Sequence, residues 1–332
     1  MWPSCHPQIG HLWYNLHISW ICHDSQKEGR VDAGYSSDLA RFTIIVSARP
    51  TFGGVGTQPG QFFQPTDVES DAQGNLYVID SKTKKLQKFD PNGNVLASVD
   101  VRSNPSDPAD SSEPWGLAVS PATGRVVVAD TFGWKIRVFD KDLKPVLAFG
   151  NAPDTSKAPG PFDLFGPRDA IIDAAGNIWV TDTGNDRIQV YSADGQFVRT
   201  VGSSGSGPGQ FDEPVGISQG TDGTIFVADM FNRRVVLLNA DGSFKSQFPV
   251  EGWGGQEVLD KPYLRALSDG RVAVSLPVLN QVRIYSAEGK LAGSLSAPED
   301  PLNRPYGIMQ TADGKLWVTE GGSGRLRLFA LP

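Results

Sequence analysis

Short stretches in which apolar and polar residues alternate recur in pairs along the chain, and this alternation predicts β-strands. The first members of the pairs are NLYVID (75–80), RVVVAD (125–130), NIWVTD (177–182), TIFVAD (224–229), RVAVSL (271–276) and KLWVTE (315–320). The second members are KLQKFD (85–90), KIRVFD (135–140), RIQVYS (187–192), RVVLLN (234–239), QVRIYS (281–286) and RLRLFA (325–330). In every pair the second stretch begins ten residues after the first, so one strand–turn–strand unit is repeated six times.

Each unit is preceded by a proline with a short strand and is followed by a fourth strand, such as QFVRTVG (196–202). Turns such as Asn92-Gly93 separate the strands, because glycine supplies the positive φ that tight hairpin turns need. The prolines stand 43 to 53 residues apart, at Pro65, Pro114, Pro167, Pro214, Pro262 and Pro305. Four short strands in such a period are typical of propeller blades. The sequence therefore predicts an all-β fold, a six-bladed β-propeller of four-stranded antiparallel blades.

The sixth unit reaches Pro332 after its third strand, and the N-terminal part of the chain offers the missing fourth strand. Residues 51–65 (TFGGVGTQPGQFFQP) align without gaps to residues 200–214 (TVGSSGSGPGQFDEP), which lead from a fourth strand into the next blade. We therefore expect residues 46–53 to form the outer strand of the sixth blade and close the ring. Residues 46–332 would form the propeller, and residues 1–45 an irregular extension.

An acidic residue ends the first strand of five pairs, and a basic residue follows it five positions later. These pairs are Asp80 and Lys85, Asp130 and Lys135, Asp182 and Arg187, Asp229 and Arg234, and Glu320 and Arg325. The fifth unit has Leu276 and Gln281 instead, so acid and base are lost together, as expected of residues in contact. We interpret the pairs as structural ties between strands rather than as catalytic groups, because they follow the repeat symmetry.

The repeats resemble the NHL-repeat family, most closely in TDTGNDRIQVYSADGQF (181–197) and VADMFNRRVVLLNADGSF (227–244). The resemblance covers about residues 46–332 and implies a six-bladed propeller. It implies no single activity, because propellers of this kind include binding modules, sensors and enzymes. Bacterial NHL propellers often lie outside the cytoplasm within larger proteins, so an extracytoplasmic or membrane-associated setting is expected. The sequence itself contains no transmembrane segment.

The chemistry available to the ring is limited, because every histidine and cysteine lies in the first 23 residues. They are Cys5, Cys22, His6, His11, His17 and His23. A Ser-His-Asp or Cys-His site, or zinc held by histidine or cysteine, is therefore excluded from residues 24–332. We interpret the first 23 residues as a loose tail, and pairing of Cys5 with Cys22 in an oxidising compartment is an open alternative. The net charge of −7, all of it in residues 51–332, makes nucleic acid an unfavourable partner.

Recognition is expected where the inner strands begin, beside the mouth of the central channel. The residues predicted to bind there are Asp67, Glu113, Trp115, Arg168, Asp169, Glu213, Tyr263, Arg265, Arg304 and Tyr306. They break the repeat symmetry, and aromatic and arginine side chains are enriched at recognition surfaces. Packing of the aromatic rings between blades is the alternative. The irregular links 100–112 and 151–165 lead to the same face, and long loops on a rigid scaffold often carry function.

The sequence thus predicts a non-catalytic scaffold that binds a protein, peptide or glycan at this face and needs no cofactor. The alternative is a hydrolase or lyase that depends on a metal held by carboxylates. Asp67, Glu113, Asp169 and Glu213 lie near the starts of the inner strands, and their carboxylates would suit Ca²⁺ or Mg²⁺. Regucalcin-like hydrolases share the six-bladed shape, but their motifs are not found in this sequence.

Overall fold

The protein is described by a computed structural model. The structure describes residues 51–102, 105–107, 110–253, 258–295 and 299–332, together with two strands near the N-terminus. The chain divides into two units, Met1–Arg49 and Pro50–Pro332. In the first unit, β1 (Cys5–Leu12) and β2 (Asn15–Cys22) form an antiparallel hairpin with Cys5 opposite Cys22. This hairpin differs from the irregular extension that the sequence predicted, because the Pro- and Trp-containing segment did not show a clear alternation.

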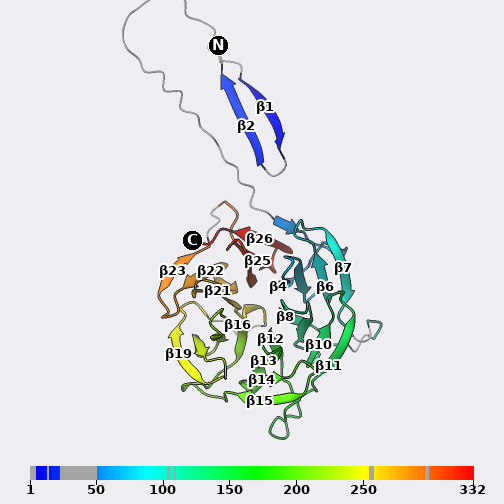
Figure 1. The fold of residues 1–332 in the computed structure, drawn as a ribbon, viewed down its shortest axis with the longest axis vertical. Helices are drawn as coiled ribbons and strands as arrows, with labels where there is room; N and C mark the ends of the chain where they lie inside the picture. The colour runs from blue at the N-terminus through cyan, green and yellow to red at the C-terminus, as the bar shows by residue number, and fades with distance from the viewer. Residues whose placement is uncertain are drawn as a thin grey trace, which may run out of the picture. The chain divides into compact units, whose positions relative to one another are not determined.

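The second unit is a ring of six four-stranded antiparallel sheets, which confirms the predicted fold class (Figure 1). The first three blades are β4 (Pro65–Ser70), β5 (Leu76–Asp80), β6 (Lys85–Phe89) and β7 (Val95–Asp100); β8 (Pro114–Val119), β9 (Val126–Asp130), β10 (Lys135–Phe139) and β11 (Pro145–Phe149); and β12 (Pro167–Ile172), β13 (Ile178–Asp182), β14 (Arg187–Tyr191) and β15 (Phe197–Val201). In each blade the first strand is innermost and the fourth outermost.

The other three blades follow the same plan. They are β16 (Pro214–Gln219), β17 (Ile225–Asp229), β18 (Arg234–Leu238) and β19 (Phe244–Pro249); β20 (Leu264–Ala266), β21 (Val272–Leu276), β22 (Gln281–Tyr285) and β23 (Leu291–Ser294); and β24 (Pro305–Gln310), β25 (Leu316–Glu320), β26 (Arg325–Phe329) and β3 (Thr51–Gly53). Short 3-10 turns are η1 (Thr183–Asn185), η2 (Val258–Asp260) and η3 (Pro277–Leu279). Five inner strands begin at the predicted proline, whereas β20 begins two residues after Pro262.

The ring is closed by its N-terminal strand, as the repeat alignment predicted. Gly53, Phe52 and Thr51 of β3 lie opposite Arg325, Leu326 and Arg327 of β26. The Phe52 ring packs edge-on against Trp317, with the centroids 5.2 Å apart. Residues 46–50 of the predicted strand lie outside the described residues. The strand that completes blade six is therefore about 270 residues distant in sequence from its partner, which couples both ends of the ring.

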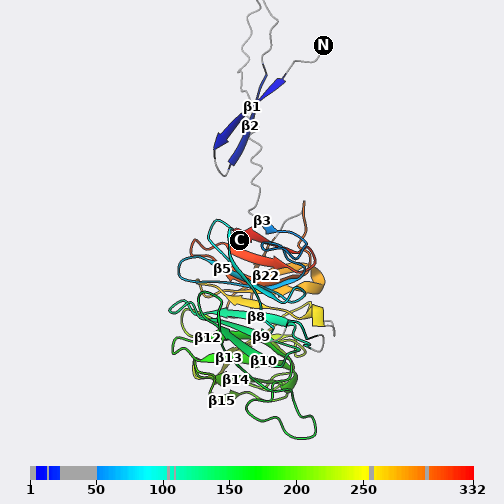
Figure 2. The same ribbon diagram turned by 90° about the vertical axis from the view of Figure 1, so that its right-hand side faces the viewer.

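The core lies between neighbouring blades, because each strand alternates apolar side chains toward both adjacent sheets. Trp179 of blade three, for example, shares one buried cluster with Phe211 and Ile217 of blade four. The link 151–163 between blades two and three projects from the ring (Figure 2). Among the described residues, no helix is long and apolar enough to cross a membrane.

Candidate functional site

We call the end of the ring at which the inner strands begin the mouth face. The loops that precede the inner strands lie there, together with the turns between the second and third strands of each blade. The central channel runs from this face along the six inner strands. The predicted binding residues divide between three places: the mouth end of the channel, a cavity further along it, and the rim.

The mouth end of the channel is filled by a plug made of Trp115, Arg168, Tyr263 and Tyr306. Three of these residues lie in the inner strands of different blades, and Tyr263 directly precedes β20. The Trp115 and Tyr306 rings meet edge to face with centroids 5.6 Å apart, and the Arg168 guanidinium lies 3.6 Å from the Trp115 ring centroid. The Tyr306 hydroxyl donates a hydrogen bond to the carbonyl of Leu259 at 2.9 Å.

All four plug side chains are buried, and none is more than 3% exposed. These four side chains are therefore not exposed in the structure, contrary to the prediction of a recognition surface, and they pack against one another in the channel rather than between blades. Burial raises the pKa of Tyr306 to about 12 and lowers the pKa of Arg168, and both shifts follow from the loss of water around the groups. Because the six inner strands converge on one axis, large side chains at the strand starts contact one another and are shielded from solvent.

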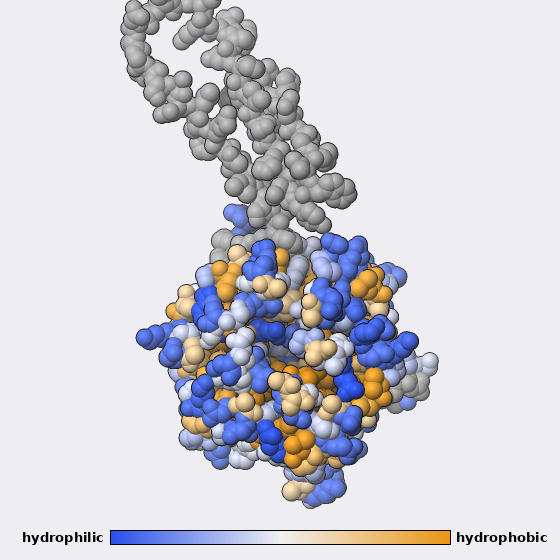
Figure 3. Space-filling view, in the orientation of Figure 1, coloured by the Kyte–Doolittle hydropathy of each residue, from blue (hydrophilic) through white to orange (hydrophobic). Residues whose placement is uncertain are grey.

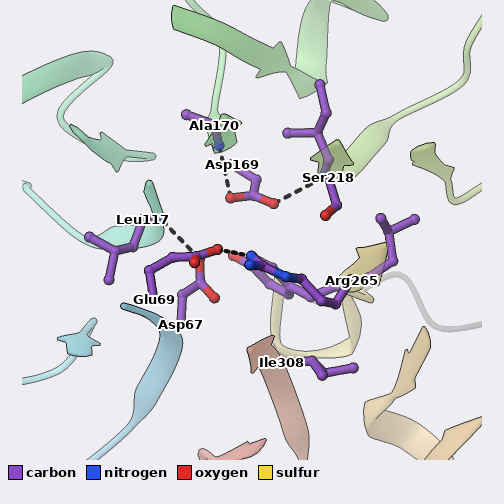
Figure 4. Close-up of a pocket in the computed structure, with 11 residues that line it drawn as sticks. Asp67, Glu69, Leu117, Asp169, Ala170, Ser218, Arg265 and Ile308 are labelled. Carbon is purple, nitrogen blue, oxygen red and sulfur yellow. Dashed lines mark hydrogen bonds and ion pairs between the residues drawn. The ribbon is translucent and has the colours of Figure 1, made fainter. Parts of the chain in front are cut away.

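Beyond the plug, the channel contains a small cavity lined by Asp67, Glu69, Asp169 and Arg265 (Figure 4). Its volume is about 10 Å³, which is about that of a single water-sized probe. Arg265 forms an ion pair with Glu69, a residue that the sequence analysis did not select. Arg265 was expected to be at the mouth, but it points across the channel instead (Figure 4).

Two carboxyl groups in this cavity are strongly perturbed. Burial raises the pKa of Asp169 to about 8, although hydrogen bonds from two backbone N–H groups favour the ionised form and lower the pKa. Burial and the nearby Asp169 and Glu69 charges raise the pKa of Asp67 well above its usual range. The Asp67 carboxylate accepts hydrogen bonds from Val68 and Leu117 at 2.8 and 2.9 Å, and Asp169 is held in the same way by Ala170 and Ile217. Each aspartate thus connects its own blade to the next.

One position of the inner strands alternates between large and small residues around the ring. In blade order it is Asp67, Gly116, Asp169, Gly216, Tyr263 and Gly307. A Cβ atom on Gly116 would lie 2.4 Å from the Arg168 carbonyl oxygen, and one on Gly307 would lie 2.4 Å from an Asp67 carboxylate oxygen. Every second residue is therefore glycine because the chain of the following blade, at its large residue, comes too close to leave room for a Cβ atom.

The acidic residues that end five of the second strands each bind the equivalent backbone N–H group of their own blade. Their carboxylates accept a hydrogen bond from the N–H seventeen residues earlier, in the loop before the inner strand. The donors are Phe63 for Asp80, Glu113 for Asp130, Phe165 for Asp182, Asp212 for Asp229 and Asn303 for Glu320, at 2.6 to 2.9 Å. All five acidic residues are buried. They fix the loops of the mouth face to the sheet.

The predicted basic partners behave in two ways. Arg187, Arg234 and Arg325 form ion pairs with Asp182, Asp229 and Glu320 at 2.8, 2.7 and 2.6 Å. The lysines do not pair as predicted: Lys85 donates to the Thr57 carbonyl at 2.6 Å, and Lys135 donates to the Gly150 carbonyl at 3.1 Å.

The physical reason is geometric. The arginine Nε–H reaches sideways to the carboxylate while the other nitrogens bond to loop carbonyls, whereas an extended lysine carries its only nitrogen past the acid. In blade two Arg137, two residues further along the strand, pairs with Asp130 at 2.8 Å instead.

The remaining predicted residues lie on the rim of the mouth face. Glu113 of blade two is near Lys82 and Lys84 of blade one, at 3.4 and 3.6 Å. Glu213 of blade four forms an ion pair with Lys261 of blade five. Arg304 is exposed, and its backbone is left-handed with φ at 49°.

The four carboxylates of the metal alternative are therefore not gathered at one place. Asp67 and Asp169 line the channel cavity, whereas Glu113 and Glu213 pair with lysines of adjacent blades on the rim. Within the part of the chain that the structure describes, no group of three or more His, Cys, Asp or Glu side chains is arranged to hold a metal.

The mouth face also carries exposed apolar side chains that the sequence analysis did not select. They are Phe63, Phe165, Phe231, Val278 and Leu279, with exposed fractions of 48%, 44%, 41%, 50% and 42%. The first two stand two residues before an inner-strand proline, and the others stand in second-to-third-strand turns. An alignment of the repeats could have found them, because most other repeats have a polar residue or glycine there. In a space-filling view of the ring, apolar side chains form separate patches among polar ones (Figure 3).

Comparison with known proteins supports the fold and leaves the function open. A family described as a 6-bladed beta-propeller matches residues 164–251. Rat peptidylglycine alpha-amidating monooxygenase is 30% identical over 147 residues, which are 42% of this chain and 15% of that protein. The human E3 ubiquitin-protein ligase NHLRC1 is 33% identical over 104 residues, which are 31% of this chain and 24% of that protein. The chain thus spans less than a quarter of the length of these relatives.

Solved structures show the same ring. A virginiamycin B lyase from Staphylococcus aureus with quinupristin has a TM-score of 0.58 at 17% identity, covering 85% of this chain and 88% of that one. A chain of a nidogen/laminin complex has a TM-score of 0.52 at 17% identity, covering 80% and 86%. The chain is therefore a six-bladed β-propeller with NHL-type relatives, and both enzymes and binding proteins share its shape.

Proposed function

We propose that this propeller is a non-catalytic binding module that recognises a protein or peptide at its mouth face, and that its blades are NHL repeats. The observation that carries the proposal is that the channel is closed at this face by buried side chains, while large apolar side chains are exposed on the turns around it. A small molecule finds no open cleft at the plug, whereas a macromolecule would cover the protruding rings.

The rigidity of the turns supports this proposal. Phe63 and Phe165 are the residues whose N–H groups bond to Asp80 and Asp182, so their backbone is fixed to the sheet. The Phe165 ring also lies against Gly184, where an added Cβ would be 2.8 Å from the ring. Anchors held in place before binding lose little conformational freedom on association, which favours affinity.

Site-specific photo-crosslinking tests the proposal. A photoreactive phenylalanine analogue is introduced at Phe165 of the mouth face and, as a matched control, at Phe197 of the outer strand β15, which is 37% exposed. The modified full-length proteins are irradiated in the native host. We expect adducts of defined mass from position 165 and none of the same mass from position 197. Equal adducts at both positions, or none at the mouth face, would count against a mouth-face binding module.

The alternative, a carboxylate-metal hydrolase or lyase, draws on one observation. Buried carboxyl groups with raised pKa are common at catalytic sites, and Asp67 and Asp169 are two such groups in the channel. Melting curves of metal-stripped protein with added Ca²⁺, Mg²⁺, Mn²⁺ or Zn²⁺ distinguish the two functions. A saturable rise in melting temperature that disappears in Asp169→Asn would establish the metal-dependent alternative and overturn the scaffold. A binding module predicts no such metal-specific shift.

A further inference from the structure

We propose that the mouth face takes an acidic segment of a partner protein, bearing apolar side chains, over the sector formed by Phe231, Arg233, Val278, Leu279 and Arg304. This proposal rests on the proposed function and narrows it to one part of the face and one partner chemistry. We call these five residues the blade-five sector, because they lie on the second-to-third-strand turn of blade five and on the loops at either side of it.

The sector is continuous. The Phe231 ring lies 4.6 Å from the Lys261 ammonium, and Lys261 directly follows η2. The η2 segment contacts η3, which carries Val278 and Leu279. On the far side, the side-chain oxygen of Asn280 accepts a hydrogen bond from the Arg304 N–H at 2.8 Å. Exposed residues from blades four, five and six therefore meet along one path.

The apolar side chains of the sector are not required by the fold. The corresponding turn in blade three is Thr183-Gly184-Asn185, and in blade six it is Gly321-Gly322-Ser323. Blade five has Pro277-Val278-Leu279 in a turn of the same length, and two of these side chains are about half exposed. Blade five is also the blade without the acid–base tie. Departures from a repeat at exposed positions are expected at functional sites rather than in the scaffold.

The five residues of the sector carry two positive charges and no negative one. Among the described residues, no ion-pair partner is found for Arg233 or Arg304, although both are exposed. The rim carboxylates of Glu113 and Glu213 are already paired with lysines. Neither Asp260 of η2 nor Asp212, whose carbonyl accepts a hydrogen bond from the Phe231 N–H at 3.1 Å, forms an ion pair with either arginine. Two free guanidinium groups beside apolar side chains complement a partner segment that combines carboxylates with apolar residues.

Selection of short random peptides displayed on phage, against the full-length protein, tests the inference. We expect enriched peptides in which Asp or Glu flank large apolar residues. Binding of the synthetic enriched peptide should fall about tenfold or more with Phe231→Asp, Leu279→Asp or the double change Arg233→Glu and Arg304→Glu. Leu291→Asp is the matched control, because Leu291 is 59% exposed on the outer strand of the same blade. A peptide whose acids are exchanged for lysine should regain affinity for the double-glutamate variant.

The outcomes separate this inference from the proposed function. Peptides that lose affinity with Phe63→Asp or Phe165→Asp, but not with the sector variants, would overturn the blade-five sector and leave a mouth-face module intact. Enriched peptides without acidic residues would overturn the charge assignment. Failure to enrich any peptide, with sector-dependent binding to vesicles of phosphatidylserine and phosphatidylcholine, would assign the sector to a lipid surface instead. Peptide binding that no mouth-face variant alters would overturn both proposals.

Discussion

The buried acids that fix the mouth-face loops to the sheet, which we call the acidic ties, give the most quantitative prediction. Blade three, with Asp182, is the best place to test it. The Asp182 carboxylate accepts hydrogen bonds from the Phe165 N–H at 2.7 Å, the Asn185 amide at 2.9 Å and Arg187 Nε at 2.8 Å. In Asp182→Ala, the Phe165 N–H loses its acceptor inside the protein. Arg187 keeps its hydrogen bonds to the carbonyls of Pro159, Gly160 and Asp163 but loses its ion-pair partner.

The size of the effect follows from these contacts. A buried donor without an acceptor costs about 1–3 kcal/mol, and a charge-assisted hydrogen bond contributes about 1.5–3 kcal/mol. Burial raises the pKa of Asp182, which shows that desolvation opposes part of this gain. We therefore expect Asp182→Ala to lower the free energy of unfolding by about 3 kcal/mol. For a domain of this size, that is a fall in melting temperature of roughly 5–10 °C by calorimetry.

Lys85 provides the internal control. Arg187→Ala should cost about 2 kcal/mol more than Lys85→Ala, because Lys85 bonds only to an exposed carbonyl and makes no ion pair with Asp80. The double change Asp182→Ala with Arg187→Ala should cost less than the sum of the single changes. Equal losses for Arg187→Ala and Lys85→Ala, or strict additivity in the double variant, would refute this account of the ties.

Other predictions follow from single features of the ring. Because the pKa of Asp169 is raised to about 8 from an unfolded value near 3.9, the folded state holds an extra proton between these pH values; the melting temperature should fall as pH rises from 5 to 8, and this slope should be smaller in Asp169→Asn. Deleting residues 1–54 should lower the melting temperature more than deleting residues 1–40, since only the first removes β3; equal losses would contradict closure by this strand. Gly116→Ala should destabilise the ring more than Ala122→Gly, an exposed-turn change, because the added Cβ meets the Arg168 carbonyl; unfolding in urea measures both, and equal midpoints would contradict the steric explanation. Fractionation of the native host should find the protein outside the soluble cytoplasm.

The sequence was sufficient for the architecture because the repeat supplies its own alignment. Strand order, the turns and the closing strand all followed from residues whose spacing is fixed by a four-stranded blade, such as Pro65 and Asp80. The second-strand acids were found for the same reason. The choice of partner was not, since Lys85 and Arg187 carry the same charge at the same position and differ only in where their nitrogens reach.

The candidate site was harder to predict because it depends on contacts across the ring. Trp115, Tyr263 and Tyr306 are far apart in sequence, and only the convergence of their strands shows that they bury each other. Leu143 is a second example: it stands in the turn where other blades have glycine, with φ at 60°, and its buried side chain packs with Tyr77 of the preceding blade. The alternation of apolar and polar residues shows on which face of the sheet a side chain lies, but it does not show which residues of other blades contact that face.

The alternation of large and small residues along the channel places a constraint on the evolution of this ring. Each glycine leaves room for the chain of the next blade at its large residue, so along the channel the repeating unit is a pair of blades rather than one. Strict alternation of large and small residues around a closed ring is possible only when the number of blades is even. Loss or duplication of one blade would place two large residues, or two glycines, side by side at the junction, with a collision in one case and a void in the other. Such a ring should gain or lose blades two at a time.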